Sequence, residues 1–171
     1  MINNGNINMI NQLGHANPFI CMKLGVPGYT SYGAYPVTKL RNDEFVIGYF
    51  QGCWTTAFDF GGFTLDDNYP FKNSISEWMT VKMDSAEVIH IGNSHFGWGT
   101  FGSTDGPSQC FHREFIDAIF EEGKTHIGEA QFDSKEDNAG RVNSDDFPYR
   151  WVYYCNNLLG DPLLELKCTQ S

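Results

Sequence analysis

Two residues of this chain have side chains suited to covalent catalysis, and both stand in the same local pattern. His15 follows a glycine at the end of the strand-like run 7–13, and Cys53 follows a glycine at the end of the strand-like run 44–51. A cysteine thiolate is a strong nucleophile, and an adjacent imidazole favours the thiolate and exchanges the proton. The pattern predicts a nucleophile–base pair, provided that the fold brings His15 and Cys53 together.

The two runs are predicted strands that have to lie side by side for this pair to form. Catalytic groups gather beyond the C-terminal ends of parallel strands, so neighbouring parallel strands would place both residues at one edge of a sheet. Sharp turns after strands also expose backbone N–H groups that can stabilise an oxyanion. The natural candidates for these donors are the amides of Ala16 and Cys53.

Each residue also has an ordinary structural explanation. A cysteine after an apolar run is most often a small buried hydrophobe. A histidine after a glycine is most often a hydrogen-bonded turn residue. The pattern by itself leaves both interpretations open.

The remaining elements indicate an α/β fold. A third strand is predicted over 86–91, and a long helix is predicted from Pro107 to a stop at Gly123. Ser74 and Glu77 have the spacing of a capping box at the start of a short helix. Strands that alternate with helices predict a mainly parallel sheet covered on both faces.

Other segments give weaker signals. The glycine- and proline-rich stretch 16–43 is predicted to be a long connection, and a further helix is predicted near 126–135. The segment 150–155 fits either a helix or a strand. A last strand is predicted over 163–166, after a turn at 160–162.

Composition bounds the class of protein. The 171 residues suit a single domain, and 15% aromatic with 19% charged residues predict a folded chain. The net charge of −10 argues against nucleic acid as a partner and would either favour basic substrates or serve solubility. The sequence has no apolar run long enough to span a membrane and no signal-peptide pattern at its start. Five scattered cysteines without a Cys-x-x-Cys pair predict neither a disulfide framework nor a zinc site.

Six stretches of the chain resemble the gingipain-like cysteine peptidases, in the same order as in that family. They include Leu13-Gly14-His15-Ala16-Asn17 and Gln51-Gly52-Cys53. Residues 57–59, which follow the cysteine turn, belong to the second stretch, and the other four are 91–94 with 97–99, 115–120, 127–130 and 157–162. The stretches are distributed over nearly the whole chain.

This resemblance implies a fold, an activity and a set of site residues. It implies an α/β caspase-like three-layer sandwich in which His15 and Cys53 form a dyad that cleaves peptide bonds. The amides of Ala16 and Cys53 would form the oxyanion hole, and Trp98 would wall a substrate-binding pocket. The resemblance further implies peptide or protein substrates, no required cofactor, calcium in some secreted relatives, and a secreted or cell-surface location.

Three positions depart from the family pattern. Ala16 stands where the residue after the histidine is typically glycine, so that position has to keep a negative φ. Thr56 stands where a glycine commonly follows the cysteine by three positions. His95 stands where an arginine often continues the Gly-Asn-Ser motif.

Relatives carry a further half of the catalytic domain before the histidine strand, including an acid that orients the histidine. We therefore expect residues 1–171 to be a single domain that forms the C-terminal portion of a larger catalytic domain. Its sheet would be incomplete at the N-terminal edge, with a missing N-terminal half or a partner chain as its neighbour. The alternatives are a pseudo-peptidase that binds peptides, a structural module, and a Cys/His hydrolase or transferase of another family.

The other polar residues have simpler predicted roles. His90 lies in an apolar strand and is predicted to be a core histidine, whereas His95 is an alternative base. His112 and His126 are predicted to be surface groups. Asp59 is predicted to brace the turn after the cysteine.

Overall fold

The computed structural model describes residues 2–4, 7–29, 33–58, 73–143 and 147–166. Within these residues, no helix is long and apolar enough to cross a lipid bilayer.

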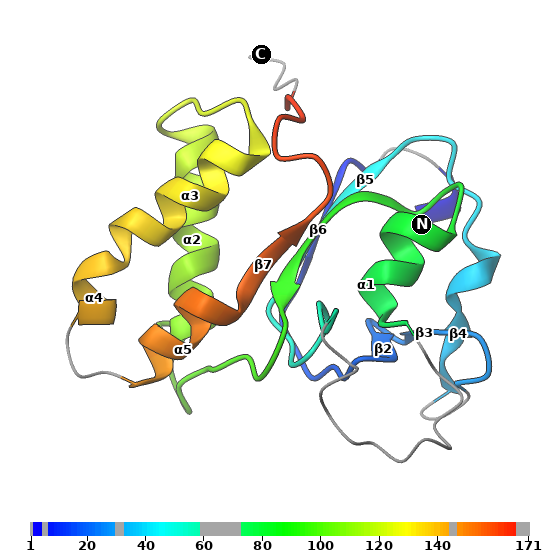
Figure 1. Ribbon diagram of the computed structural model, residues 1–171, viewed down its shortest axis with the longest axis horizontal. Helices are drawn as coiled ribbons and strands as arrows, with labels where there is room; N and C mark the ends of the chain where they lie inside the picture. The colour runs from blue at the N-terminus through cyan, green and yellow to red at the C-terminus, as the bar shows by residue number, and fades with distance from the viewer. Residues whose placement is uncertain (1, 5–6, 30–32, 59–72, 144–146, 167–171) are drawn as a thin grey trace.

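A four-stranded sheet organises the fold, with strand order β1-β5-β6-β7 (Figure 1). Strands β1 (Met9–Gln12), β5 (Val46–Phe50) and β6 (Glu87–Asn93) are parallel. Strand β7 (Asn156–Leu159) is antiparallel to β6. The sheet is thus mainly parallel, as predicted. No described strand pairs with the outer edge of β1, so the sheet is open there.

Helices and a small second sheet cover the two faces and complete a three-layer architecture (Figure 1). One face carries α2 (Pro107–Phe120), α3 (Ile127–Asp137), α4 (Ala139–Asn143) and α5 (Phe147–Cys155). The other face carries α1 (Ile75–Glu77), which continues as the π-helical segment Trp78–Lys82. Short 3₁₀ turns occur at Ile2–Asn4 and Val37–Lys39.

Alternating side chains of β5 supply both cores, because successive residues of a strand point to opposite faces. Tyr49 is fully buried in the core formed with α2, where its ring lies 5.1 Å from that of Phe115. Phe50 is fully buried in the core that contains Ile75 and Met79. Burial on both faces explains why this strand is an unbroken apolar run.

The helix signals in the sequence are confirmed. The hydroxyl of Ser74 accepts a hydrogen bond from the Glu77 amide, and the Glu77 carboxylate accepts one from the Ser74 amide at 2.7 Å. Gly123 follows the long helix with φ of 73°, which glycine adopts without steric cost.

The stretch predicted as a long connection contains a small sheet. Strands β2 (Ile20–Cys21) and β3 (Leu24–Gly25) form a hairpin, and β4 (Tyr35–Pro36) pairs with β3 in parallel. The hairpin turn is Met22-Lys23, with φ of 48° and 63°. Such a turn normally uses Asn and Gly, so these two residues conceal it in the sequence.

The last predicted strand is wrong. Residues 163–166 form only an isolated bridge, between His126 and Glu165, and the fourth strand of the sheet is β7. Asp161 bends the chain instead, because its carboxylate and its carbonyl accept hydrogen bonds from the amides of Leu163 and Leu164. The segment 150–155 is helical, and β7 follows it without a loop.

His112 was predicted to be a surface group, and this is wrong. Its ring is partly buried and packs edge-on against Tyr49, with centroids 4.8 Å apart. Burial lowers the pKa of His112 from its usual 6.5 to about 4, since the imidazolium would lose hydration.

This lowered pKa predicts acid sensitivity of the fold. Below about pH 6.5 the unfolded chain gains a proton at His112 while the folded protein does not, so stability falls as the pH drops toward 4. We expect this residue to account for roughly 1–2 kcal/mol between pH 7 and pH 4.5, allowing for its partial exposure. The melting temperature across this range tests it. His112→Phe should flatten the dependence, and an unchanged slope in that variant would contradict the assignment.

Candidate active site

Strands β1 and β5 are parallel neighbours, so His15 and Cys53, which follow them in the sequence, lie at the same edge of the sheet. Gln12 is paired with Phe50 in register, and the amide of Gln51 donates to the carbonyl of Gln12 at 2.9 Å. The two segments that follow β1 and β5 therefore leave the sheet at the same level. His15 and Cys53 each stand three positions beyond the last paired residues.

The turns that carry the two residues are packed against each other. A Cβ added to Gly52 would lie 2.6 Å from the Cβ of Ala16 and 2.9 Å from the carbonyl oxygen of Gly14. Only glycine permits this approach. His15 is exposed and Cys53 is half-buried, so both side chains are open to solvent. The structure thus brings together the two turns that the sequence analysis selected.

The predicted oxyanion donors lie at this contact. The amide nitrogen of Ala16 is 3.4 Å from the position that a Cβ on Gly52 would take. Neither the Ala16 amide nor the Cys53 amide donates a hydrogen bond to any residue that the structure describes. Ala16 does not have a positive φ, so alanine is compatible with this backbone.

The turn after Cys53 is held in a strained conformation. Trp54 has φ of 54°, a left-handed value that costs a non-glycine residue free energy. Two backbone bonds, one to the last residue of β6 and one to the segment after it, maintain it. The Trp54 amide donates to the carbonyl of His95 at 2.7 Å, and the Thr56 amide donates to that of Asn93 at 3.1 Å. Thr56, a departure from the family pattern, is therefore part of the anchor.

Asn93 is a site residue that the sequence analysis missed. Its side chain is fully buried, and its amide nitrogen donates to the carbonyls of Gln51 and Gly52 at 3.1 and 3.2 Å. These are the two carbonyls that precede Cys53. The available signal was the Gly-Asn-Ser motif at the end of the third strand, because a buried asparagine there needs backbone partners.

The loop after β6 places Trp98 beside the cysteine turn. The carbonyl oxygen of Gly97 lies 3.9 Å from Cys53 Sγ and accepts from the thiol. The backbone of Trp98 is fixed by Ser108, whose amide donates to its carbonyl and whose hydroxyl accepts from its amide. The Trp98 side chain is 36% exposed and meets the Phe147 ring edge-on.

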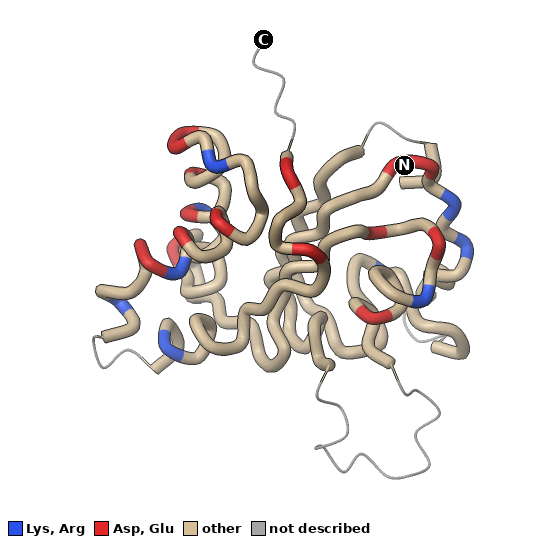
Figure 2. The backbone as a smooth tube through the Cα atoms, turned by 45° about the horizontal axis from the view of Figure 1, so that its top comes forward, with Lys and Arg blue, Asp and Glu red and all other residues tan. Residues whose placement is uncertain are grey.

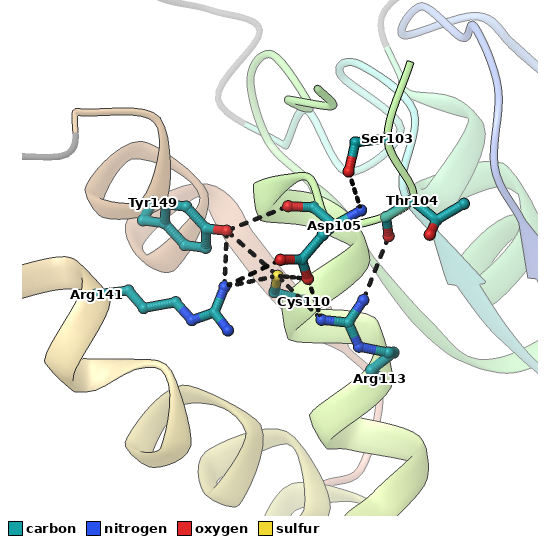
Figure 3. Close-up of polar contacts among 7 residues, drawn as sticks. All are labelled: Ser103, Thr104, Asp105, Cys110, Arg113, Arg141 and Tyr149. Carbon is teal, nitrogen blue, oxygen red and sulfur yellow. Dashed lines mark hydrogen bonds and ion pairs between the residues drawn. The ribbon is translucent and has the colours of Figure 1, made fainter. Parts of the chain in front are cut away.

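The far end of this loop is tied to three helices (Figure 3). The Asp105 carboxylate accepts from Arg113 of α2 and pairs with Arg141 of α4, while its carbonyl accepts from the Tyr149 hydroxyl of α5. The bond from Arg113, and a further one from the Cys110 thiol, lower the pKa of Asp105. Cys110 is fully buried within this cluster.

With this geometry in view, comparison with known proteins identifies the family. A sequence profile of peptidase family C25 matches residues 1–167. The chain belongs to peptidase family C25. No curated protein matches the sequence.

Two solved structures share the fold of this chain. The Arg-specific cysteine proteinase gingipain R matches with a TM-score of 0.69 and 15% identity over 96% of this chain. A structure titled simply as a protease matches with a TM-score of 0.61 and 15% identity, again over 96% of this chain. This chain spans 34% and 36% of the two matched chains, about a third of their length.

Three described segments at this edge contain no charged side chain. Residues 13–22, 51–58 and 93–104, which follow β1, β5 and β6, contain no Lys, Arg, Asp or Glu. Figure 2 shows the charged residues gathered on the helices and on the opposite edge of the sheet. Among the described residues, the groups around Cys53 are therefore mainly backbone dipoles and neutral side chains.

The other predicted residues lie as follows. His90 is fully buried, with its Nδ1 2.7 Å from the Glu87 carboxylate, which confirms a core histidine. His95 packs edge-on against Trp151. His126 is partly exposed at the start of α3. Asp59 lies outside the described residues.

One group of acidic residues could hold a cation. Carboxylate oxygens of Glu122, Asp133 and Asp137 lie within 4.8 Å of one another. The ammonium group of Lys124 lies 3.5 Å from Glu122 and 3.4 Å from Asp133. This lysine already neutralises part of the cluster, which lies on the helices and not at the cysteine turn.

The contact between the two turns predicts the effect of Gly52→Ala. The added methyl group would force the Cys53 turn away from Ala16, at a cost of about 1–3 kcal/mol in stability. We expect a lower melting temperature and slower alkylation of Cys53 by iodoacetamide. Gly140→Ala is the matched control, because a Cβ there meets nothing within 4 Å. Equal behaviour of the two variants would rule out a close contact at Gly52.

The role of Asn93 predicts that Asn93→Asp is strongly destabilising. The carboxylate has the same shape but cannot donate, so two buried carbonyls would lose their partner at a cost of more than about 2 kcal/mol. Denaturant unfolding measures this loss. Asn11→Asp is the control, since Asn11 is exposed and accepts through its oxygen from Gln51. A difference of less than about 0.5 kcal/mol between the variants would contradict the role.

Proposed function

We propose that this chain carries the catalytic dyad of a cysteine endopeptidase, with Cys53 as nucleophile and His15 as general acid–base. The contact between their two turns, at the Gly52 position against Ala16 and Gly14, is the observation that carries the proposal. Family membership supports the class of chemistry.

The dyad would work through an acyl-enzyme. The His15 imidazole takes the proton of the Cys53 thiol, and the thiolate attacks the carbonyl carbon of a peptide bond. His15 then gives the proton to the leaving amine. The amine departs, and the acyl group stays on the Cys53 sulfur as a thioester. Water, deprotonated by His15, attacks this thioester and releases the acid, and the thiol is restored.

The surrounding groups have supporting roles in this proposal. The amides of Ala16 and Cys53 stabilise the oxyanion of each tetrahedral intermediate, since neither is used by a described residue. Trp98 offers an apolar wall for a substrate side chain, because its ring is partly exposed in the loop that touches Cys53 Sγ. The proposed steps use groups of the protein and water, so they require no cofactor.

The proposal extends to the setting of the protein. Because the chain spans about a third of the matched structures, we propose that the remaining part of a larger catalytic domain, or a partner chain, completes the substrate-binding surface. By analogy with the family, we place the activity outside the cell or at its surface.

Selective alkylation tests the dyad. Near neutral pH, iodoacetamide should modify Cys53 at least about tenfold faster than Cys155, which is also half-buried and serves as an internal control. His15→Ala should remove most of this difference, because the thiolate loses its base. Mass spectrometry of the cysteine-containing peptides measures both rates.

The outcomes separate the alternatives. Selective alkylation with cleavage of a peptide library that Cys53→Ala abolishes supports the peptidase. Peptide binding that survives Cys53→Ala, with no turnover by the parent protein, indicates a pseudo-peptidase. A Cys53 that reacts no faster than Cys155 contradicts the dyad and favours a structural module.

A further inference from the structure

Near the Cys53 turn, four buried polar side chains form a cluster that we call the polar seam. They are Glu87, His90, Thr55 and Thr56, and all are less than 5% exposed. The His90 ring is stacked on Phe50, with centroids 4.3 Å apart. His90 of β6 therefore lies on the same face of the sheet as Phe50, the last residue of β5, which stands three positions before the proposed nucleophile.

Four atoms of this seam have no hydrogen-bond partner among the described residues, and each is closed off from solvent. Glu87 Oε1 lies beside Gly48, 2.5 Å from the position that a Cβ there would take, and the other three are His90 Nε2 and the hydroxyl oxygens of Thr55 and Thr56. His90 uses its other ring nitrogen for Glu87 at 2.7 Å. Whichever way the proton is shared between that pair, Nε2 is a polar atom that needs a partner. Buried polar atoms without partners are rare and costly, so three together call for an explanation.

His90 Nε2 and the two hydroxyl oxygens converge on one place. All lie within 3.3 Å of the position that a Cβ on Gly92 would occupy, and they are its three nearest neighbours. Because glycine has no Cβ, the two threonine hydroxyls pack directly against the sheet, 2.3 and 2.5 Å from the position that a Cβ would take, and His90 Nε2 lies beside them. A buried water typically makes about three hydrogen bonds to groups of this kind. The number and chemistry of these three atoms thus match one water molecule.

We propose that an ordered water molecule binds between His90 Nε2, Thr55 Oγ1 and Thr56 Oγ1, and that His90 is through it a positioning residue for the Cys53 turn. The water donates to His90 Nε2 or accepts from it, according to which ring nitrogen carries the proton, and it exchanges hydrogen bonds with the two hydroxyls. Thr55 and Thr56 follow the strained residue Trp54, so a water bound to their hydroxyls holds the Cys53 turn in place. The positioning role rests on the proposed function, whereas the water site does not.

Paired substitutions test the water by the sign of the stability change. Thr55→Val and Thr56→Val replace each hydroxyl with a methyl group of similar shape. If the hydroxyls hold a water, each change should lower the melting temperature by about 2–4 °C. If they are unpartnered, valine removes a desolvation penalty and the melting temperature rises, which overturns the proposal. The controls Thr55→Ser and Thr56→Ser keep the hydroxyl and should retain most of the stability.

A high-resolution crystal structure of the unmodified protein gives a second test that needs no variant. An ordered water at about 2.7–3.2 Å from all three atoms supports the site. Direct bonds between His90 and the threonines, or an empty space, overturn it.

The positioning role has its own readout. In the double valine variant, alkylation of Cys53 relative to Cys155 should fall about tenfold, while the serine variants stay within about twofold. An unchanged ratio in a destabilised variant would show a structural water without a positioning role. If Cys53 is not selectively alkylated in the unmodified protein, the proposed function fails, but the melting temperatures and the crystal structure still decide the water site.

Discussion

In-register pairing of the parallel strands β1, β5 and β6 is the constraint on which the candidate site depends. Parallel strands end at the same edge of a sheet, so pairing of Gln12 with Phe50 and of Phe50 with Gly92 brings three turns together there. A slip of one residue would turn every side chain to the other face and move His15 relative to Cys53. Because Tyr49 and Phe50 fill opposite cores, such a slip is strongly disfavoured. The packing of the cores thus determines the geometry of the site.

The site itself is built mostly from backbone groups. Asn93 orders the carbonyls before Cys53, backbone bonds hold the strained Trp54 after it, and Gly97 supplies the carbonyl near its sulfur. Charged residues are absent from these segments, and the ionic cluster around Asp105 anchors the loop from a distance. In our proposal, a water molecule bound in the buried polar seam adds further support to this turn. Contacts from several parts of the fold therefore hold the Cys53 turn in one conformation.

Much of the fold could be predicted, and the failures have physical causes. The three parallel strands, the capping box at Ser74 and the long helix stopped by Gly123 follow from local patterns. The hairpin at Met22 was hidden because tertiary contacts impose a left-handed turn on residues that do not signal one. His112 was misplaced because its burial depends on Tyr49, a residue far away in the chain.

The sequence by itself determined the candidates: a histidine and a cysteine, each after a glycine at the end of a strand-like run, in a pattern typical of one peptidase family. It also predicted a mainly parallel sheet, since strand-like runs alternate with helices. Only the tertiary structure decided that the two turns meet at Gly52, that Asn93 holds one of them, and that His90 leaves a ring nitrogen unpartnered. These are contacts between segments distant in the chain, and no local pattern encodes which atoms packing will bring together.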